Sequence, residues 1–168
     1  MKFMGEPVHT PTSSFAEELA AIPGGEAVNK CIQCGTCTAS CAVARYSDEY
    51  RPRQLIQKIL LGEREEVLKS ELPWLCMTCR LCEERCQEGV SPAEVFHAVR
   101  ILAAREGHVP LAFRQVMAAL MRDGWILGDS YTDFEEEDRE DLGLETDLGW
   151  NNEFLHRLKQ YLPLEEDE

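Results

Sequence analysis

The sequence predicts an all-α fold with irregular cysteine-rich loops. Three observations favour it: apolar residues recur at helical spacing, no segment alternates convincingly as a strand would, and one run of cysteines occurs twice. The chain has 168 residues, 44% hydrophobic and 29% charged, which suits one domain with tails. We expect an N-terminal arm over 1–25, a cysteine-rich helical domain over 26–128 and an acidic C-terminal extension over 129–168.

The first clear helix is expected over 52–61. Leu55, Ile56, Ile59 and Leu60 fall on one face of a helix in this segment. Gly62 follows as the residue that ends the helix in a left-handed conformation. Shorter helical candidates cover 14–22, 63–69 and 152–162.

Two further helices follow the second cysteine run. Ser91 and Glu94 have the spacing of a capping box, with Pro92 as the first helical residue. The helix that they start is expected to reach Gly107. A third helix is expected from 110 to near 124, with an inward face made of Phe113, Val116, Met117 and Leu120.

The cysteines form an internal repeat. The spacing of Cys31, Cys34, Cys37 and Cys41 is repeated 45 residues later by Cys76, Cys79, Cys82 and Cys86. Gly62 and Gly107 each lie 21 residues after the last cysteine of their run. Each repeat is therefore interpreted as a cysteine loop followed by a helix.

The spacing C-x2-C-x2-C-x3-C is typical of [4Fe–4S] ligation, and eight thiolates supply two clusters with none left over. In two-cluster ferredoxins the fourth cysteine of each run binds the other cluster. We therefore predict two sets of ligands: Cys31, Cys34, Cys37 and Cys86 for one cluster, and Cys76, Cys79, Cys82 and Cys41 for the other. Zinc sites and disulfides fit this doubled pattern less well.

Composition excludes several functions. The net charge is −14, which disfavours binding to nucleic acids or anionic membranes. The longest apolar run has six residues, too short for a membrane span, and no secretory leader is visible. We expect a cytoplasmic, reducing location. The four histidines form no catalytic pattern, no nucleotide-binding glycine loop is present, and we expect no catalytic residues.

Apolar residues flank the ligands: Ile32 in the first run, and Trp74, Leu75, Met77 and Leu81 around the second. We expect them to exclude water from the clusters, or simply to pack in the core.

The last forty residues are strongly acidic. Residues 129–168 carry 15 acidic and 3 basic side chains, and runs such as 135–141 are typical of solvated, mobile chain. Between them, Phe154, Leu155, Leu158, Tyr161 and Leu162 form a helical apolar stripe. We hypothesise that this extension and the N-terminal arm wrap a partner protein.

Four stretches together resemble the C subunit of heterodisulfide reductase: CIQCGTCTASC at 31–41, the helix end ILLG at 59–62, WLCMTCRLCEERC at 74–86 and VRILAAREG at 99–107. The resemblance covers about residues 26–125. It implies a helical ferredoxin-like fold with two [4Fe–4S] clusters, held by the eight cysteines. It also implies a complex in which a larger flavin and iron–sulfur protein, the A subunit, feeds electrons to the C subunit. The C subunit passes them to a cysteine-rich catalytic protein, the B subunit.

Three alternatives remain open. The chain could be the iron–sulfur subunit of another flavoprotein oxidoreductase, although the 30 residues before Cys31 leave no room for a plant-type ferredoxin domain. It could be a free two-cluster ferredoxin, although such carriers are usually far shorter. A redox sensor would need a DNA-binding element that the sequence lacks.

Overall fold

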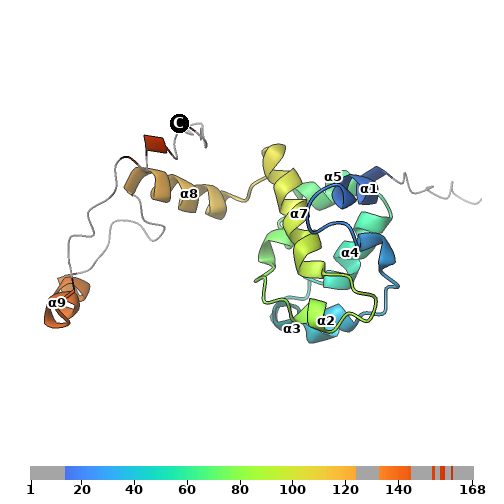
Figure 1. Ribbon diagram of the computed structural model, residues 1–168, viewed down its shortest axis with the longest axis horizontal. Coiled ribbons are helices and arrows are strands. Elements are labelled where there is room, and N and C mark those ends of the chain that lie inside the picture. The colour runs from blue at the N-terminus through green and yellow to red at the C-terminus, as the bar shows by residue number, and fades with distance from the viewer. Residues whose placement is uncertain (1–13, 124–132, 145–152, 154–155, 158–159, 161–168) are drawn as a thin grey trace, which may run out of the picture. The chain divides into compact units, whose positions relative to one another are not determined.

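The computed structural model describes residues 14–123, 133–144, 153, 156, 157 and 160 (Figure 1). Every regular element among these residues is helical, which confirms the all-α prediction. The chain divides into two compact units, 1–109 and 110–168. This boundary differs from the predicted one at 128, because the cysteine-rich unit already ends after its longest helix.

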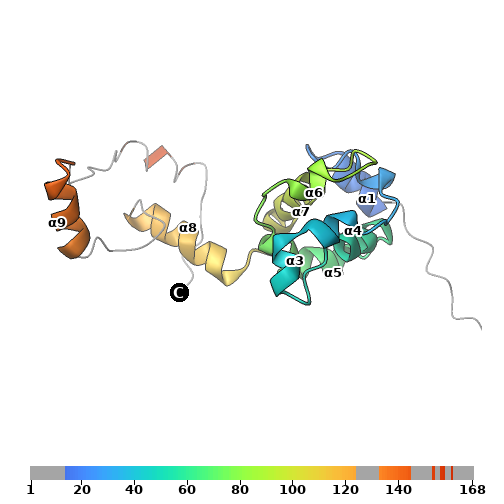
Figure 2. The same ribbon diagram turned by 90° about the horizontal axis from the view of Figure 1, so that it is seen from below.

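The first unit contains seven α-helices and two short 3-10 helices among its described residues. Their bounds are α1 Ser14–Ala20, η1 Val28–Lys30, α2 Thr36–Ser40, α3 Ala42–Tyr46, α4 Pro52–Leu60, α5 Arg64–Lys69, η2 Leu72–Leu75, α6 Leu81–Glu84 and α7 Pro92–Arg105. Helices α1 and α5 each contact both α4 and α7, so these four form the helical body of the unit (Figures 1 and 2).

One apolar core holds this unit together. Its largest fully buried side chains include Phe15 and Leu19 of α1, Ile56 and Ile59 of α4, and Phe96 of α7. Helix α1 therefore packs into the core of this unit, although it lies within the segment expected as an N-terminal arm. Burying a large apolar side chain stabilises a fold by about 1.5–3 kcal/mol, so the burial of Phe15 and Leu19 stabilises the packing of this short helix against the core.

The helices end as the repeat predicted. Gly62 and Gly107 both have φ +78°, the left-handed conformation that favours glycine. The next amide donates back to a carbonyl in the last turn: Glu63 N to Lys58 O at 3.0 Å, and His108 N to Ala103 O at 2.8 Å. These are Schellman motifs, which satisfy the last carbonyls of each helix.

The two repeats are not equal between these landmarks. Helix α4 has 9 residues and α7 has 14. The first repeat makes up the difference before its helix, because Pro52 follows Cys41 by 11 residues whereas Pro92 follows Cys86 by 6. The extra five residues lie in the segment that includes α3.

The capping box predicted at the start of α7 does not form. Ser91 occupies the N-cap position, but its side chain makes no capping hydrogen bond. The carboxylate of Glu94 instead binds Arg80, with Arg80 Nη1 2.7 Å from Glu94 Oε1. An ion pair to a neighbouring loop has replaced the local hydrogen bond.

Arg64 at the start of α5 connects three helices. Its guanidinium donates to Glu18 of α1 at 2.7 and 2.9 Å. It also donates to Glu106, directly after α7, at 3.2 Å and through a second, shorter bond. Since 46 and 42 residues separate Arg64 from these partners, this network stabilises tertiary rather than local structure.

The second unit contains two described helices, α8 Leu111–Asp123 and α9 Asp133–Asp141. The predicted extent of α8 is confirmed, and its predicted inward face is covered only in part. Phe113 is 42% exposed and Val116 is 40% exposed, whereas Met121 is buried. Met117 and Leu120, the other two residues of that face, are partly buried.

Helix α9 includes the acidic run 135–141, which the sequence analysis described as typical of solvated, mobile chain. Glutamate has a high intrinsic helix propensity, which favours a helix in this run. Gly143, with φ +66°, then ends the helix: its own amide donates to Glu140 O, and that of Leu144 donates to Arg139 O, both at 2.9 Å. The apolar stripe expected over 154–162 lies outside the described residues.

None of the described helices has both the length and the apolar character that a membrane span requires.

Candidate metal centre

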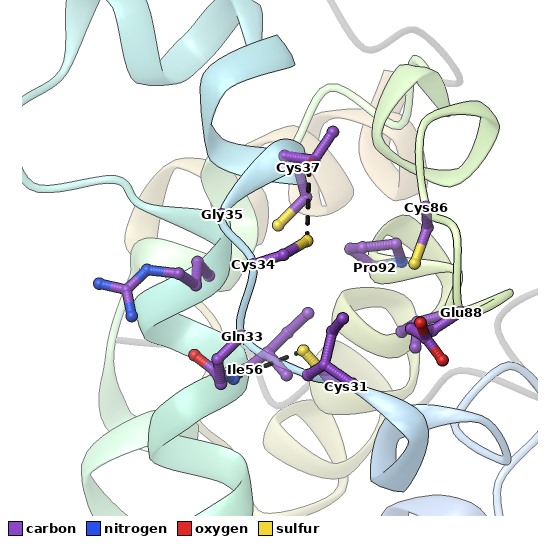
Figure 3. Close-up of a pocket in the computed structure, with 13 residues that line it drawn as sticks. Cys31, Gln33, Cys34, Gly35, Cys37, Ile56, Cys86, Glu88 and Pro92 are labelled. Atoms are coloured by element: carbon purple, nitrogen blue, oxygen red, sulfur yellow. Dashed lines mark hydrogen bonds between the residues drawn. The ribbon is translucent and has the colours of Figure 1, made fainter.

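The first cysteine cavity contains sulfur atoms from both runs. Cys31, Cys34 and Cys37 line it together with Cys86, whose side chain faces it from the second repeat (Figure 3). It encloses about 370 Å³, part of which is open to solvent. The structure thus brings together the four residues predicted for one cluster.

The second cavity has the reciprocal composition. Cys76, Cys79 and Cys82 line it together with Cys41 from the first repeat, and it encloses about 460 Å³. The remaining four predicted ligands therefore meet here.

The packing of two short helices accounts for this exchange. Helix α2 carries Cys37 and ends at Ser40, directly before Cys41, and α6 carries Cys82 and ends at Glu84, two residues before Cys86. The two helices contact each other. The end of each helix consequently lies close to the cysteine loop of the other repeat. The last cysteine of each run therefore joins the first three cysteines of the other run.

Both loops use the same unusual backbone. Gln33 and Thr78, which are 45 residues apart, have φ of +59° and +55°. The next matching pair, Gly35 and Arg80, has φ of +85° and +61°. Alternating left-handed residues create concave backbone turns that bind anions and iron–sulfur centres. A non-glycine residue in this conformation costs about 1–2 kcal/mol, so three such residues in two loops indicate a functional constraint.

Two polar side chains contact sulfur in the first cavity. Gln33 Nε2 donates to Cys31 Sγ at 3.4 Å, and Thr36 Oγ1 lies 3.3 Å from Cys34 Sγ. The Thr36 contact is the main cause of a lowered pKa for the Cys34 thiol. The other amide atom of Gln33, Oε1, is buried without a hydrogen-bond partner among the described residues, which costs about 1–3 kcal/mol.

The second cavity is supported from other elements. Tyr50 lines it, and burial, followed by the charge of Cys76 and a hydrogen bond to it, raises the phenol pKa far above its ordinary value. Arg100 on α7 donates to the carbonyl of Cys76 at 3.2 Å. Burial also raises the pKa of the Cys82 thiol to about 11, so metal binding there must displace a proton.

Arg51 braces the longer segment of the first repeat. Its Nη1 donates to the carbonyls of Ala44 at 2.8 Å and Ser47 at 2.6 Å, and its Nη2 binds Asp48 at 3.1 Å. These bonds tie the segment that leads from Cys41 to α4 into one unit.

Three of the five apolar residues beside the ligands line the cavities: Ile32 the first, and Met77 and Leu81 the second. Ile32 is 62% exposed and Met77 is 72% exposed, and these two residues occupy equivalent positions in the two loops. Leu75 and Leu81 are also exposed, whereas Trp74 packs against the core. The expectation that these residues exclude water from the clusters therefore stays a prediction for Ile32, Met77 and Leu81, and Trp74 has the core-packing role.

The sequence did not identify Tyr50, Arg51, Gln33 or Arg100 as parts of this site. Their roles depend on contacts across the fold or on backbone conformation, neither of which residue type and spacing reveal. One indication was present: Pro52 and Pro92, expected only as helix starts, line the second and first cavities respectively.

The donor set fits a cluster better than a single ion. Among the described residues, no three His, Cys, Asp or Glu side chains converge on a position that could hold one metal ion. The sulfurs instead surround two larger spaces, each with four soft thiolate donors and a loop of anion-binding geometry.

Comparison with known proteins agrees with this chemistry. Residues 27–90, which include all eight cysteines, match the family described as a 4Fe-4S dicluster domain. The C subunit of the Ferredoxin:CoB-CoM heterodisulfide reductase of Methanosarcina mazei is 32% identical over 133 residues, a match that covers 78% of this chain and 80% of that protein. The chain belongs to the family of heterodisulfide reductase C subunits.

Other family members give higher identity over shorter stretches. The iron-sulfur C subunit of the CoB--CoM heterodisulfide reductase of Methanopyrus kandleri is 39% identical over 118 residues, which cover 70% of this chain and 60% of that protein. The corresponding C 2 subunit of Methanocaldococcus jannaschii is 39% identical over 99 residues, covering 59% and 52%. The chain thus spans between half and two thirds of the length of these relatives. Family membership confirms the predicted resemblance and an iron–sulfur domain that binds [4Fe–4S] clusters.

Proposed function

We propose that this chain holds two [4Fe–4S] clusters and relays single electrons between the other subunits of a heterodisulfide-reductase-like complex. Cys31, Cys34, Cys37 and Cys86 would ligate the first cluster. Cys76, Cys79, Cys82 and Cys41 would ligate the second. The observation that carries the proposal is the reciprocal lining of two cavities, each by three thiols of one run and the fourth thiol of the other.

The clusters would supply reversible one-electron chemistry. The chain itself would provide binding and position. Four thiolates saturate each cluster and leave no site for a substrate, which agrees with the expectation that this protein is not itself catalytic. Because every ligand set joins both repeats, the bound clusters would also crosslink α2, α6 and the body of the unit, and so stabilise the fold.

The proposed partners are a flavin and iron–sulfur protein of the A type and a cysteine-rich catalytic protein of the B type, in the cytoplasm. Two findings support a permanent complex over a diffusible carrier. Relatives in this family are named as subunits of heterodisulfide reductases. In addition, α8 exposes Leu111 at 57% and Val116 at 40%, an apolar surface that a partner would cover.

Iron counting tests cluster number and ligand exchange together. The full chain, reconstituted anaerobically, should bind about eight iron and eight sulfide ions. If the ligand sets are exchanged as proposed, the double variant Cys31→Ser/Cys86→Ser removes two ligands of one cluster and should retain about half of the iron.

The matched double variant is Cys82→Ser/Cys86→Ser. It also removes two thiols, but one from each proposed set, and should lose nearly all of the iron. If each run instead held its own cluster, the two results would be reversed. A wild-type chain that bound neither iron nor sulfide would refute the proposal as a whole.

Anaerobic affinity purification of the tagged chain from its native host tests the partners. Recovery of a cysteine-rich protein together with an iron–sulfur flavoprotein supports the complex. Deletion of 129–168 should weaken this recovery if the acidic extension docks on a partner. Recovery of the chain alone, as a monomer with both clusters, would instead identify a diffusible carrier.

A further inference from the structure

Gln33 is the residue of the first loop that iron ligation alone does not explain. It lies between Cys31 and Cys34 with φ +59°, and its amide oxygen is buried without a hydrogen-bond partner among the described residues. Both features destabilise the folded chain. The compensating contact is a hydrogen bond of 3.4 Å from Nε2 to Cys31 Sγ.

The orientation of this amide follows from the chemistry of the sulfur. A thiolate can only accept hydrogen bonds, so the NH₂ group must face Cys31 and the carbonyl oxygen must face the protein. Turning the amide over would place the oxygen beside a negatively charged sulfur. The unpartnered position of Oε1 is therefore the consequence of directing the donor at a cluster ligand.

The second loop provides an internal comparison. Thr78 is the equivalent residue and has nearly the same backbone conformation, φ +55°. Its side chain, however, is exposed, whereas Gln33 is half-buried in the wall of the first cavity (Figure 3). The left-handed backbone is thus common to both loops, and the buried amide is specific to the first.

We propose that Gln33 raises the reduction potential of the cluster ligated by Cys31. This inference rests on the proposed function, since it requires that cluster. A reduced cluster carries one more negative charge than an oxidised one, so a donor aimed at its thiolate stabilises the reduced state more. Gln33 acts through the sulfur of Cys31 and is a positioning residue for the redox centre.

The test is an anaerobic redox titration of the reconstituted full chain, followed by electron paramagnetic resonance. Gln33→Met removes the donor and keeps the length of the side chain. We expect one of the two cluster potentials to become more negative, with about a tenfold lower ratio of reduced to oxidised cluster at the original midpoint. For a one-electron couple, this is about 59 mV.

Two further variants make the result specific. Gln33→Glu keeps the shape of the side chain but substitutes a carboxylate, and should lower the same potential at least as far. Thr78→Val changes the matching position of the second loop and should leave unchanged the potential that responds to Gln33→Met. Iron and sulfide contents are measured before each titration, so that cluster loss is distinguished from a shift in potential.

The outcomes separate the two proposals. If Gln33→Met and Gln33→Glu both carry full iron and keep both wild-type potentials, the role of Gln33 is refuted and the two-cluster proposal stands. If Thr78→Val shifts that same potential as much as Gln33→Met does, a general effect of loop substitution replaces the hydrogen bond as the explanation. If the wild-type chain holds no cluster, both proposals fail.

Discussion

Arg64→Met should destabilise the cysteine-rich unit far more than its position on a short surface helix suggests. Arg64 lies in α5, yet its four hydrogen bonds reach Glu18 in α1 and Glu106 after α7. Methionine keeps the apolar part of the side chain and its helix propensity. The variant therefore removes chiefly the connection between three helices.

The magnitude follows from geometry and exposure. The side chains of Arg64, Glu18 and Glu106 are 28%, 37% and 34% exposed, so water screens each pair in part. An exposed ion pair contributes about 0.2–1 kcal/mol, and a guanidinium bonded to two carboxylates reaches the upper end for each. We expect a loss of about 1–2 kcal/mol. In a domain of this size, each kcal/mol corresponds to about 4–8 °C in the unfolding midpoint.

The assay is thermal unfolding of the cluster-loaded full chain under anaerobic conditions, followed by circular dichroism. Lys69→Met is the matched control, because it removes one positive charge from the same helix and one ion pair with Glu65 within a single turn. The control should unfold within error of the wild type. If Lys69→Met and Arg64→Met lower the midpoint equally, charge on α5 matters and the tertiary network does not.

The same network has a defined pH dependence. The hydrogen bond from Arg64 lowers the pKa of Glu18 from its ordinary value of 4.5. A carboxyl group whose pKa is lower in the folded state stabilises the protein at pH values above its pKa in the unfolded chain. This stabilisation is lost as the pH falls through the pKa of the folded state. The stability difference between wild type and Arg64→Met should thus be constant near neutrality and shrink below pH 4.5. A difference that grew on acidification would contradict this mechanism.

Three further predictions concern the cysteine loops. Thr36→Val removes the hydroxyl beside Cys34 and should make one cluster potential more negative, as a redox titration would measure; unchanged potentials would exclude a bond to that sulfur. Arg51→Met removes the hydrogen bonds that hold the segment after Cys41, so the visible absorbance of the clusters should decay faster after a chelator is added. An unchanged rate would show that the segment keeps its conformation without these bonds. Gly35→Ala should cost about 1–2 kcal/mol through its φ of +85°, and an unaltered unfolding midpoint would refute that cost.

The sequence predicted those features that depend on spacing and local pattern. The cysteine spacing indicated two equivalent loops, and Gln33/Thr78 and Gly35/Arg80 repeat the same backbone conformations 45 residues apart. The helices over 52–60 and 64–69 follow from periodicity, and Gly62 marks where the first of them ends. These features depend on the spacing of side chains and the positions of glycines, both of which can be read from the sequence.

The features it missed depend on partners distant in the chain. The sequence around Glu94 allows two partners for its carboxylate: Ser91 in a capping box, or Arg80 in an ion pair. Nothing in the local sequence indicates that the ion pair forms. Here tertiary geometry decided between two locally reasonable alternatives.

The contrast between the loops bears on how such a relay would work. The ligands and the backbone turns repeat, but the side chains around them do not. Gln33 and Thr36 contact sulfur in the first cavity, whereas the equivalent residues of the second loop, Thr78 and Leu81, are exposed. Two clusters with identical surroundings would have equal potentials and give an electron no preferred position. Different hydrogen bonds to sulfur, with common ligands, are a direct way for a duplicated motif to separate the two potentials.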